Sequence, residues 1–543
     1  MKTIKPTLLV FLFTVVSCLL IFKSPLLAQD AKDNNTRPEE VPLQIEDNRV
    51  NVPLQSVLML ALKNNLDIIF ASLQPEIAAT DVTREKSAYD TLFTSQFSKN
   101  RYNQQKDASF GQKDTVSEEV VNLDVSVRKK FTPGTQAELS LNHYERQTDS
   151  EFYGLVPMYS GDINLSLTQP LLKDFGIEIG KSMIKIAKLN LEVSENEFRK
   201  NVMDILFQIE SYYWNLFFQI EDLKSKEGSL KRAESFLREF KIRIDAGTLA
   251  PIEIYQAKAE VALRKQEVIV AKARVKQAED NLKSALNLYE DQTYWNINII
   301  PIDQPETEKT QPDLLESIQI ALEKRPDFKQ AQLNIKASDI QVKYSKNQTL
   351  PRIDLIGSIG SNGIAGRPRE NNTAFLGPIL GKLFKTTNPS PYRGHWDDVY
   401  DHMADKDIYN YYIGIKFEFP LENRMAKSQY SRSKIQASQS VTSLKNAENL
   451  IINEVRDAIR LLETSREVID SAEASLKYSQ ERLKAEEKKY KVGMSTTYLV
   501  LEFQDELSQA ESTLAYAQTE HSKSIANLAR VKGVLLEDKG LEM

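Results

Sequence analysis

The sequence predicts a mainly α-helical fold with a smaller β portion, in which one structural unit occurs twice. Two long segments carry an apolar residue at every seventh position, the spacing of helices that supercoil against neighbours. Segments of alternating apolar and polar residues precede each of them, which is typical of β-strands. The same marks recur in both halves of the 543-residue chain. We therefore expect long antiparallel coiled-coil helices joined to strands, with an internal two-fold repeat.

Short marks in the first half return in the second half in the same order. Three pairs lie 260, 250 and 246 positions apart, namely Ala61 with Ala321, Pro170 with Pro420, and Gly247 with Gly493. A unit of this length is far too long for a solenoid repeat. We expect two copies of one module, placed side by side or around an axis, and set them at residues 52–300 and 301–543.

Residues 1–28 are expected to be a secretory signal peptide. Lys2 and Lys5 precede the apolar run Leu8–Phe22, which is too short for a comfortable transmembrane helix, and Ala28 is a plausible cleavage point. The sequence around Cys18, the only cysteine, resembles a lipoprotein cleavage box, so lipidation is an alternative. The apolar run continues beyond that cysteine, which favours an ordinary signal. Residues 29–51 are polar and predict an extended N-terminal linker.

Composition and charge exclude several classes of function. The net charge is −6 with both signs interspersed, so no nucleic-acid footprint is present. The four histidines fall in no catalytic arrangement, and no phosphate-binding loop or nucleophile elbow occurs. We expect neither enzymatic activity nor a cofactor. Beyond residue 28 no apolar run reaches about 18 residues, so any crossing of a membrane must use strands.

A short helix and then strands are expected in each half. The helices span about 52–88 and about 313–346. The strand segments alternate apolar and polar residues, and lie at 93–102, 121–127, 137–142 and 163–168 in the first half and at 353–359 and 411–419 in the second. One apolar and one polar face suits a membrane barrel, and a half-buried sheet of a soluble protein gives the same pattern.

Long helices follow the strands, at about 179–245 and 421–490. Their apolar stripes are Val202, Ile209, Leu216, Leu223, Leu230, Leu237 and Ile244 in the first, and Val455, Leu462, Ile469, Leu476, Leu483 and Tyr490 in the second. At about 1.5 Å per residue each helix is roughly 100 Å long. Gly247 and Gly493 permit sharp reversals into return helices at about 252–288 and 498–535.

These marks together resemble the TolC-type outer-membrane efflux proteins over nearly all of the sequence that follows the signal. The marks are Ala61–Asp67 and Ala321–Asp327 at the helix starts, Gln169–Leu171 after a strand, Tyr213–Leu216, and the turns at Gly247 and Gly493. The resemblance implies a homotrimer. Each chain lends four strands to a twelve-stranded transmembrane β-barrel and its helices to an α-barrel below. The extra hairpin around Pro133 and Gly134 departs from that pattern.

The resemblance also implies a function and partners. The protein is expected to be an outer-membrane exit duct of a tripartite efflux or type I secretion system. It would pass substrate passively from an inner-membrane transporter, through a periplasmic adaptor protein that docks near Gly247 and Gly493. The alternative class is a non-conducting coiled-coil structural protein of the cell envelope. The two-copy layout disfavours a third class, a secreted pore-forming toxin.

Candidate site residues follow from the same resemblance. Glu253 and Glu502 match acidic positions of a periplasmic gate or selectivity ring, and Tyr490 matches a tyrosine that ties neighbouring helices. Leu499 and Ser495 stand where the family has a second ring aspartate and an arginine latch. Ordinary solvated carboxylates at helix starts, favoured by the helix dipole, are the alternative for both glutamates. The tip turns at Gly247 and Gly493, and the strand-to-helix turns at Pro170 and Pro420, complete the expected set.

One further cluster could bind a metal. His395, Asp398 and His402 would share one face of a helix. The surrounding segment is rich in Pro, Gly and Asn, which is typical of an exposed polar loop, and we expect no metal site there.

Overall fold

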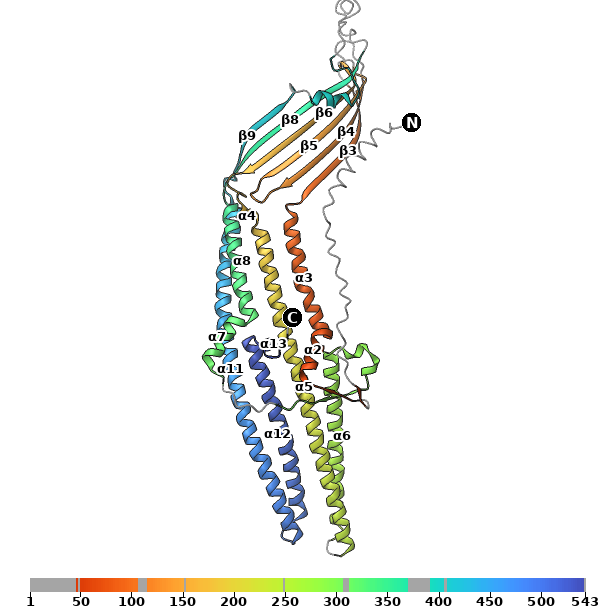
Figure 1. Cartoon of the computed structure of the whole chain (residues 1–543), viewed down its shortest axis with the longest axis vertical. Coiled ribbons are helices and arrows are strands. Elements are labelled where there is room, and N and C mark those ends of the chain that lie inside the picture. The colour runs from red at the N-terminus through yellow and green to blue at the C-terminus, as the bar shows by residue number, and fades with distance from the viewer. Residues whose placement is uncertain are drawn as a thin grey trace, which may run out of the picture.

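The structure is a computed structural model that describes residues 45–46, 49–105, 115–150, 153–247, 250–305, 312–369, 391–404 and 408–541. The expected signal peptide, with Cys18, and the first part of the expected linker lie outside this set. The molecule is elongated, with a β-sheet at one end and two helical hairpins that reach the other end (Figure 1).

Each expected short helix is divided into two helices. The first pair is α2 (Leu54–Asn64) and α3 (Leu66–Ser87), and the second is α7 (Leu314–Lys324) and α8 (Pro326–Gln348). Asn65 and Arg325 interrupt them with extended backbone. The Asn65 carboxamide caps α3, because its Oδ1 accepts the Ile68 N–H at 2.9 Å. No single helix of the described chain is long and apolar enough to cross a membrane, although α2 and α3, bent by 50°, pass that test together.

Four helices form the rods. They are α5 (Ser182–Asp245), α6 (Glu253–Ala285), α11 (Arg424–Lys491) and α12 (Thr497–Lys532). The 64 residues of α5 and the 68 of α11 give lengths near 100 Å at about 1.5 Å per residue. Every member of both seven-residue stripes is buried or half-buried. The prediction of two long rods with a packing seam is confirmed.

The helices lie in a layer that is four helices wide. Near the tips the order across the layer is α11, α12, α5 and α6, and nearer the sheet it is α11, α8, α5 and α3. The helices α5 and α11 run through both levels (Figure 1). Short helices α4 (Ile177–Gly180) and α13 (Leu535–Asp538) and the 3-10 turns η1 (Leu288–Glu290) and η2 (Gln292–Tyr294) complete this part.

The large sheet has six strands in the order β3-β4-β5-β6-β8-β9, all antiparallel. Their bounds are Thr91–Gln105, Thr115–Lys130, Gln136–Thr148, Leu155–Pro170, Arg352–Pro368 and Asn410–Glu418. The sheet thus contains two strands more than the four per chain that the resemblance implies for the barrel. The added pair is β4 and β5, which a turn at Pro133 and Gly134 connects. Helix α10 (Asp398–Met403) packs on β6 and β8.

A second, small sheet lies beside the middle of α5. It contains β1 (Ile45–Glu46), β2 (Arg49–Val52) and β7 (Asn298–Pro301), and β2 runs parallel to β7. Residues 49–51, expected as the end of an extended linker, are thus a strand, because Val50 and Val52 enter the main apolar core. The alternation of two buried valines is too short to identify this strand in advance.

Candidate functional site at the helical tips

The two tip turns lie together at the end of the molecule opposite the large sheet (Figure 1). Gly247 and Gly493 have φ angles of 71° and 77°, which L-residues with a side chain rarely adopt. Apart from the neighbouring residues of the chain, no atom of the described residues lies within 4 Å of a Cβ placed at either glycine. The backbone conformation alone therefore requires glycine, and the space beside each turn is open. Residues 248–249 of the first turn lie outside the described set.

Tyr490 joins the two hairpins through an aromatic cluster. Its ring lies 5.4 Å from that of Phe236 and 6.2 Å from that of Phe240, both on α5, with centroids as the reference points. The Arg243 guanidinium lies 4.8 Å from the Tyr490 centroid. Burial is the main cause that raises the pKa of Tyr490 above 10.0. The matched tyrosine thus bridges helices α11 and α5, with contacts that favour close aromatic packing.

Glu253 forms a direct link between the two tips. It is the first residue of α6, and its Oε2 accepts a hydrogen bond of 2.8 Å from the Thr497 hydroxyl at the start of α12. The negative charge also suits a helix N-terminus, where the backbone N–H groups are unpaired. Glu253 is therefore more than a solvated carboxylate, because it fastens the first-half tip to the second-half tip.

Ser495 stabilises the second turn internally. Its hydroxyl donates to Glu486 Oε1 at 2.6 Å, and Lys489 Nζ lies 2.9 Å from Glu486 Oε2. The serine hydrogen bond is the largest cause, and the lysine a further one, that holds the pKa of Glu486 below 4.5. Where the family resemblance implies an arginine latch to another element, this chain has a short contact within one turn.

Glu502 stands apart from this network. Its side chain is exposed on α12, between the buried Leu501 and Phe503. No hydrogen bond or ion pair of Glu502 is recorded within the described part of the chain. Leu499, at the other family acidic position, packs partly buried against the apolar cluster of the tip. The structure therefore brings Glu253 and Tyr490 together with the second tip and leaves Glu502 at the surface.

An arginine that sequence reasoning missed ties α6 to α12. Arg264 is 5% exposed, and its guanidinium contacts Glu260 at 2.6 Å and Glu267 at 3.1 Å on its own helix. It also bonds to Asp505 on α12. These two residues are 241 positions apart, so no local spacing marks them as partners. The sequence offered one signal for this contact: α6 is rich in alanine on the face that packs against its neighbours, and Arg264 lies among those alanines.

A polar seam continues this connection between α5 and α12. The Ser512 hydroxyl donates to Asp222 Oδ1 at 2.5 Å, and the Ser225 hydroxyl donates to Glu511 Oε2 at 2.7 Å. Asp222, Ser225 and Ser512 are all buried. Buried polar groups need such partners, because an unsatisfied one is costly. The contact between the two hairpins is thus polar along this stretch and apolar at the tip.

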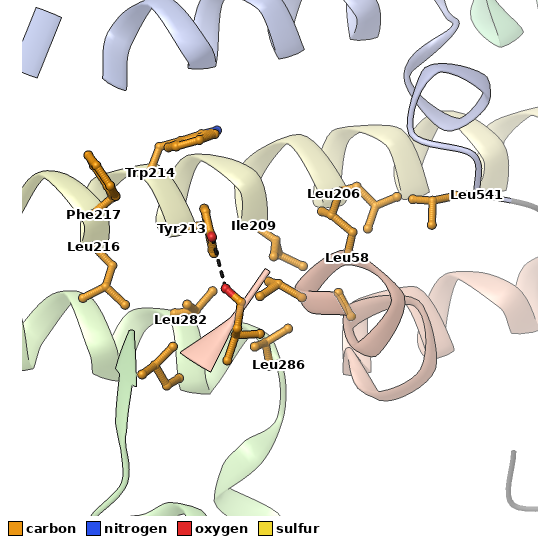
Figure 2. Close-up of a cluster of buried hydrophobic side chains, with 14 of the residues drawn as sticks. Leu58, Leu206, Ile209, Tyr213, Trp214, Leu216, Phe217, Leu282, Leu286 and Leu541 are labelled. Carbon is orange, nitrogen blue, oxygen red and sulfur yellow. Dashed lines mark hydrogen bonds between the residues drawn. The ribbon is translucent and has the colours of Figure 1, made fainter. Parts of the chain in front are cut away.

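The opposite end of the hairpins is anchored in the main core (Figure 2). Tyr213 lies within this core, and its hydroxyl donates to Asp303 Oδ2 at 2.6 Å and approaches the Val52 carbonyl at 3.1 Å. The same Asp303 oxygen accepts the Leu54 N–H at 2.6 Å. The mark Tyr213–Leu216 therefore fixes α5 against the small sheet. Rigid anchoring here concentrates any hairpin movement at the free tips.

The remaining expected sites occupy connecting positions. Pro170 is the last residue of β6, before α4 and α5, and Pro420 lies between β9 and α11. The described residues contain no group of three or more side chains that could hold a metal. His402 Nδ1 instead lies 2.8 Å from the Ile364 carbonyl, and the Asp398 carboxylate accepts the His395 backbone N–H at 2.6 Å.

Comparison with known proteins extends this description. The sequence profile of the family described as "Outer membrane efflux protein" matches residues 125–288 and 317–534. Outer membrane protein TolC of Escherichia coli strain K12 is 20% identical over 347 residues. That alignment covers 64% of this chain and 64% of TolC, which is just under two thirds of that relative.

Solved structures show the same fold. The outer-membrane channel OprN has a TM-score of 0.62 at 16% identity, with 88% of this chain and 89% of OprN covered. The Campylobacter jejuni CmeC outer membrane channel has a TM-score of 0.59 at 17% identity, with 90% of each chain covered. These likenesses concern the whole elongated molecule rather than one domain.

Proposed function

The chain belongs to the outer membrane efflux protein family, and on this premise we propose that it is an exit duct of a tripartite efflux or type I secretion system. Substrate would pass through it passively, from an inner-membrane transporter across the periplasm and the outer membrane. The observation that carries the proposal is a rod of about 100 Å continuous with a two-faced sheet in one chain. The sheet suits lipid, and the rod suits a periplasmic span.

The proposed duct is a homotrimer, and the edges of the helical layer support this. One edge is α11, and the other consists of α3 and α6. Both edges expose large apolar side chains: Leu450, Leu461, Val468 and Tyr478 on α11, Ile69, Phe70, Leu73 and Ile77 on α3, and Tyr255, Leu263, Ile269 and Val270 on α6. Apolar stripes of this extent favour association. Two different edges produce head-to-tail contacts, which form a ring when the rotation between successive copies closes.

The family places the chain in the outer membrane, and the proposed arrangement directs its helices into the periplasm. A periplasmic adaptor protein would then meet the tips at Gly247 and Gly493, where the surface around both turns is open. The transporter would supply the energy for passage.

We further propose that the tip contacts hold the periplasmic mouth narrow. Glu253 with Thr497, Arg264 with Asp505, and Tyr490 with two phenylalanines all join the hairpin α5–α6 to the hairpin α11–α12. Separation of the hairpins must break these contacts. The free energy of adaptor binding would compensate for their loss. Exposed Glu502 side chains, one from each chain, would add a ring of negative charge that attracts cations.

Planar-bilayer recording of the detergent-extracted full chain tests the proposal. We expect small, cation-preferring channels for the natural sequence and larger conductance for Glu253→Ala and Thr497→Val. Glu502→Ala should reduce cation preference, because it removes charge without breaking a contact between hairpins. A chain that conducts in none of these forms would favour the alternative, a non-conducting coiled-coil scaffold of the envelope.

A further inference from the structure

We infer that all six strands of each chain belong to the wall of the outer-membrane barrel, so that a trimer closes it with eighteen strands. The inference rests on the proposed trimer and concerns the bore of that duct. It replaces the twelve-stranded barrel that four strands per chain would give. Three features of the sheet support the inference, namely the pairing of the strands, the two faces and the two outer edges.

The added strands are fully integrated into the sheet. β3 pairs with β4 from Thr91↔Lys129 to Gln105↔Thr115 without a register shift. β4 pairs with β5 from Glu118↔Thr148 to Lys130↔Gln136, again without a shift. A hairpin that left the wall would break one of these ladders. The pairing is instead as continuous here as between β8 and β9.

One face of the sheet is apolar across all six strands. A single row of paired residues crosses the sheet as Phe93, Val127, Leu139, Leu165, Ile359 and Tyr411. Much of this face is exposed in the single chain, as Phe97 at 65% and Ile413 at 75% illustrate, and Val399 of α10 covers it at Gly161 and Gly363. Exposed apolar surface on this scale needs a covering medium. The added hairpin shares the face, so it needs the same medium as its neighbours.

The opposite face is polar along the same strands. The paired residues Gln96, Asp124, Asn142, Asp162 and Asn362 form one row on it. Asn142 Nδ2 donates to Asp162 Oδ2 at 2.9 Å within this row. Lipid outside and water inside require this division, with alternate residues on each face. The division extends from β3 to β9, so the whole sheet fits one wall.

The apolar face also has the height of a membrane. In β4 it extends from Val127 to Val121, where it ends, because Lys99 pairs with Val121 across the sheet and forms an ion pair of 2.6 Å with Glu119. In β6 it extends from Leu167 to Tyr159. Seven to nine residues at about 3.4 Å each, tilted by about 40°, rise roughly 18–23 Å. This is close to the apolar band of roughly 25 Å in known outer-membrane barrels.

The two outer strands are suited to pair with another copy. Within the described residues no strand pairs with the outer edge of β3 or of β9. Neither strand contains proline or a bulge, two of the features that protect an edge. Lipid does not tolerate unpaired backbone, and six strands do not close upon themselves. β3 leaves the helices and β9 returns to them, so β9 of one copy and β3 of the next run antiparallel.

Eighteen strands give a wider bore than twelve. With about 4.8 Å between strands and a tilt of about 40°, each strand occupies roughly 6.3 Å of circumference. The backbone diameter is then about 36 Å, against about 24 Å for twelve strands. Barrels of sixteen to eighteen strands leave an aqueous channel. The polar inner face suits bulky hydrophilic cargo better than small apolar solutes.

Disulfide and short bismaleimide cross-linking of cysteine pairs tests the inference in intact outer membranes, on a Cys18→Ala background. One member is Thr94→Cys, Gln96→Cys or Ser98→Cys in β3, and the other is Asn410→Cys, Tyr412→Cys or Gly414→Cys in β9. The matched control series places the first member in β5, as Ser140→Cys or Asn142→Cys. We expect trimeric ladders from at least one β3–β9 pair and none from β5–β9.

Two outcomes would overturn the inference of eighteen strands, and both can be distinguished from a failure of the proposed function as a trimeric duct. Cross-links of β5 to β9 would show that β3 and β4 lie outside a twelve-stranded wall. A further pair, Leu263→Cys with Tyr478→Cys, reports the helical edges at a similar distance from the tips. If that pair forms trimers and no β3–β9 pair does, the duct stands and the eighteen-stranded wall fails. If neither forms oligomers, the proposed trimer fails as well.

Discussion

Single residues near the tips make contacts between helices that could not be inferred from the kind of amino acid at each position. Arg264 is an example, because its guanidinium is buried and in contact with three carboxylates, one of them on another helix. A charge in this position is tolerated only while its partners remain. The same alternative, a solvated carboxylate at a helix start, applied to Glu253 and Glu502 in the sequence, yet among the described contacts only Glu253 bonds to the neighbouring tip.

Arg264→Ala should lower the free energy of unfolding by about 2 kcal/mol, since it removes a buried partner of several carboxylates. The matched control is Lys272→Ala. Lys272 pairs with Glu227 at 3.2 Å, but both side chains are more than half exposed, so a change of at most about 1 kcal/mol is expected. Thermal and denaturant unfolding of both variants provides the comparison. Equal effects would mean that Arg264 does not hold α6 to α12.

The second tip turn should loosen in acid. Since Ser495 and Lys489 hold the pKa of Glu486 below 4.5, the folded turn favours the ionised carboxylate. Its stabilisation is present above pH 4.5 and is lost as the pH falls through the lower folded value. The protection factors for hydrogen exchange in peptides covering residues 484–500 should fall in acid more for the natural chain than for Ser495→Ala. Identical pH profiles of the two proteins would contradict this.

Tyr213→Phe should destabilise the chain by about 1–2 kcal/mol, because Asp303 loses a donor and the hydroxyl is buried. Tyr516→Phe is a suitable control, since Tyr516 is 51% exposed and packs edge-on against Phe218. Chemical denaturation monitored by circular dichroism measures both. A loss in Tyr516→Phe as large as in Tyr213→Phe would show that the Asp303 contact contributes nothing specific.

At the scale of elements, periodicity predicted the rods well and their interruptions poorly. The seven-residue stripes end where α5 and α11 end. The apolar residues that produce the periodic pattern are the same residues that pack each helix against its neighbours. The break at Asn65 combines a local cap with a tertiary hydrogen bond of 2.7 Å from Asn65 Nδ2 to the Ala285 carbonyl, and the break at Arg325 precedes Pro326, which disfavours helical backbone at the residue before it. The small sheet was missed because β2 has only four residues.

The tip glycines offer a test of element geometry. Gly493→Ala should cost about 1–2 kcal/mol, because Gly493 has a φ of 77° and no steric contact adds to the backbone cost. Gly228→Ala is the opposite case, since Gly228 lies within helix α5, where alanine is preferred by about 0.5–1 kcal/mol. Thermal unfolding should therefore shift in opposite directions. A stabilised Gly493→Ala would refute the required turn conformation.

At the scale of the whole molecule, one chain is an incomplete structure. Its helical layer and its sheet each have two free edges, and exposed apolar residues lie at both. The resemblance implied the arrangement of helices and strands correctly, because the heptads and alternating segments follow from packing against neighbours. The resemblance could not give the number of strands. An added hairpin with the same alternation of apolar and polar residues fits the same sheet as the other strands.

Leu461→Lys and Val468→Lys should weaken assembly, because each places a charge on the exposed apolar edge of α11. Glu463→Lys is the control, since Glu463 is also exposed on α11 but is already charged. Dissociation of the detergent-solubilised assembly, followed by light scattering against protein concentration, measures the effect. We expect at least a tenfold weaker association for the double variant. Equal association of control and variant would place the contact elsewhere.

End-on electron micrographs of the purified full-length protein in detergent test the central claim most directly. The account predicts a three-fold ring of helices around a central bore, with side views that show a narrow shaft below a wider membrane section. Compact single chains, or a solid bundle without a bore, would contradict the claim that this chain is one third of a hollow duct.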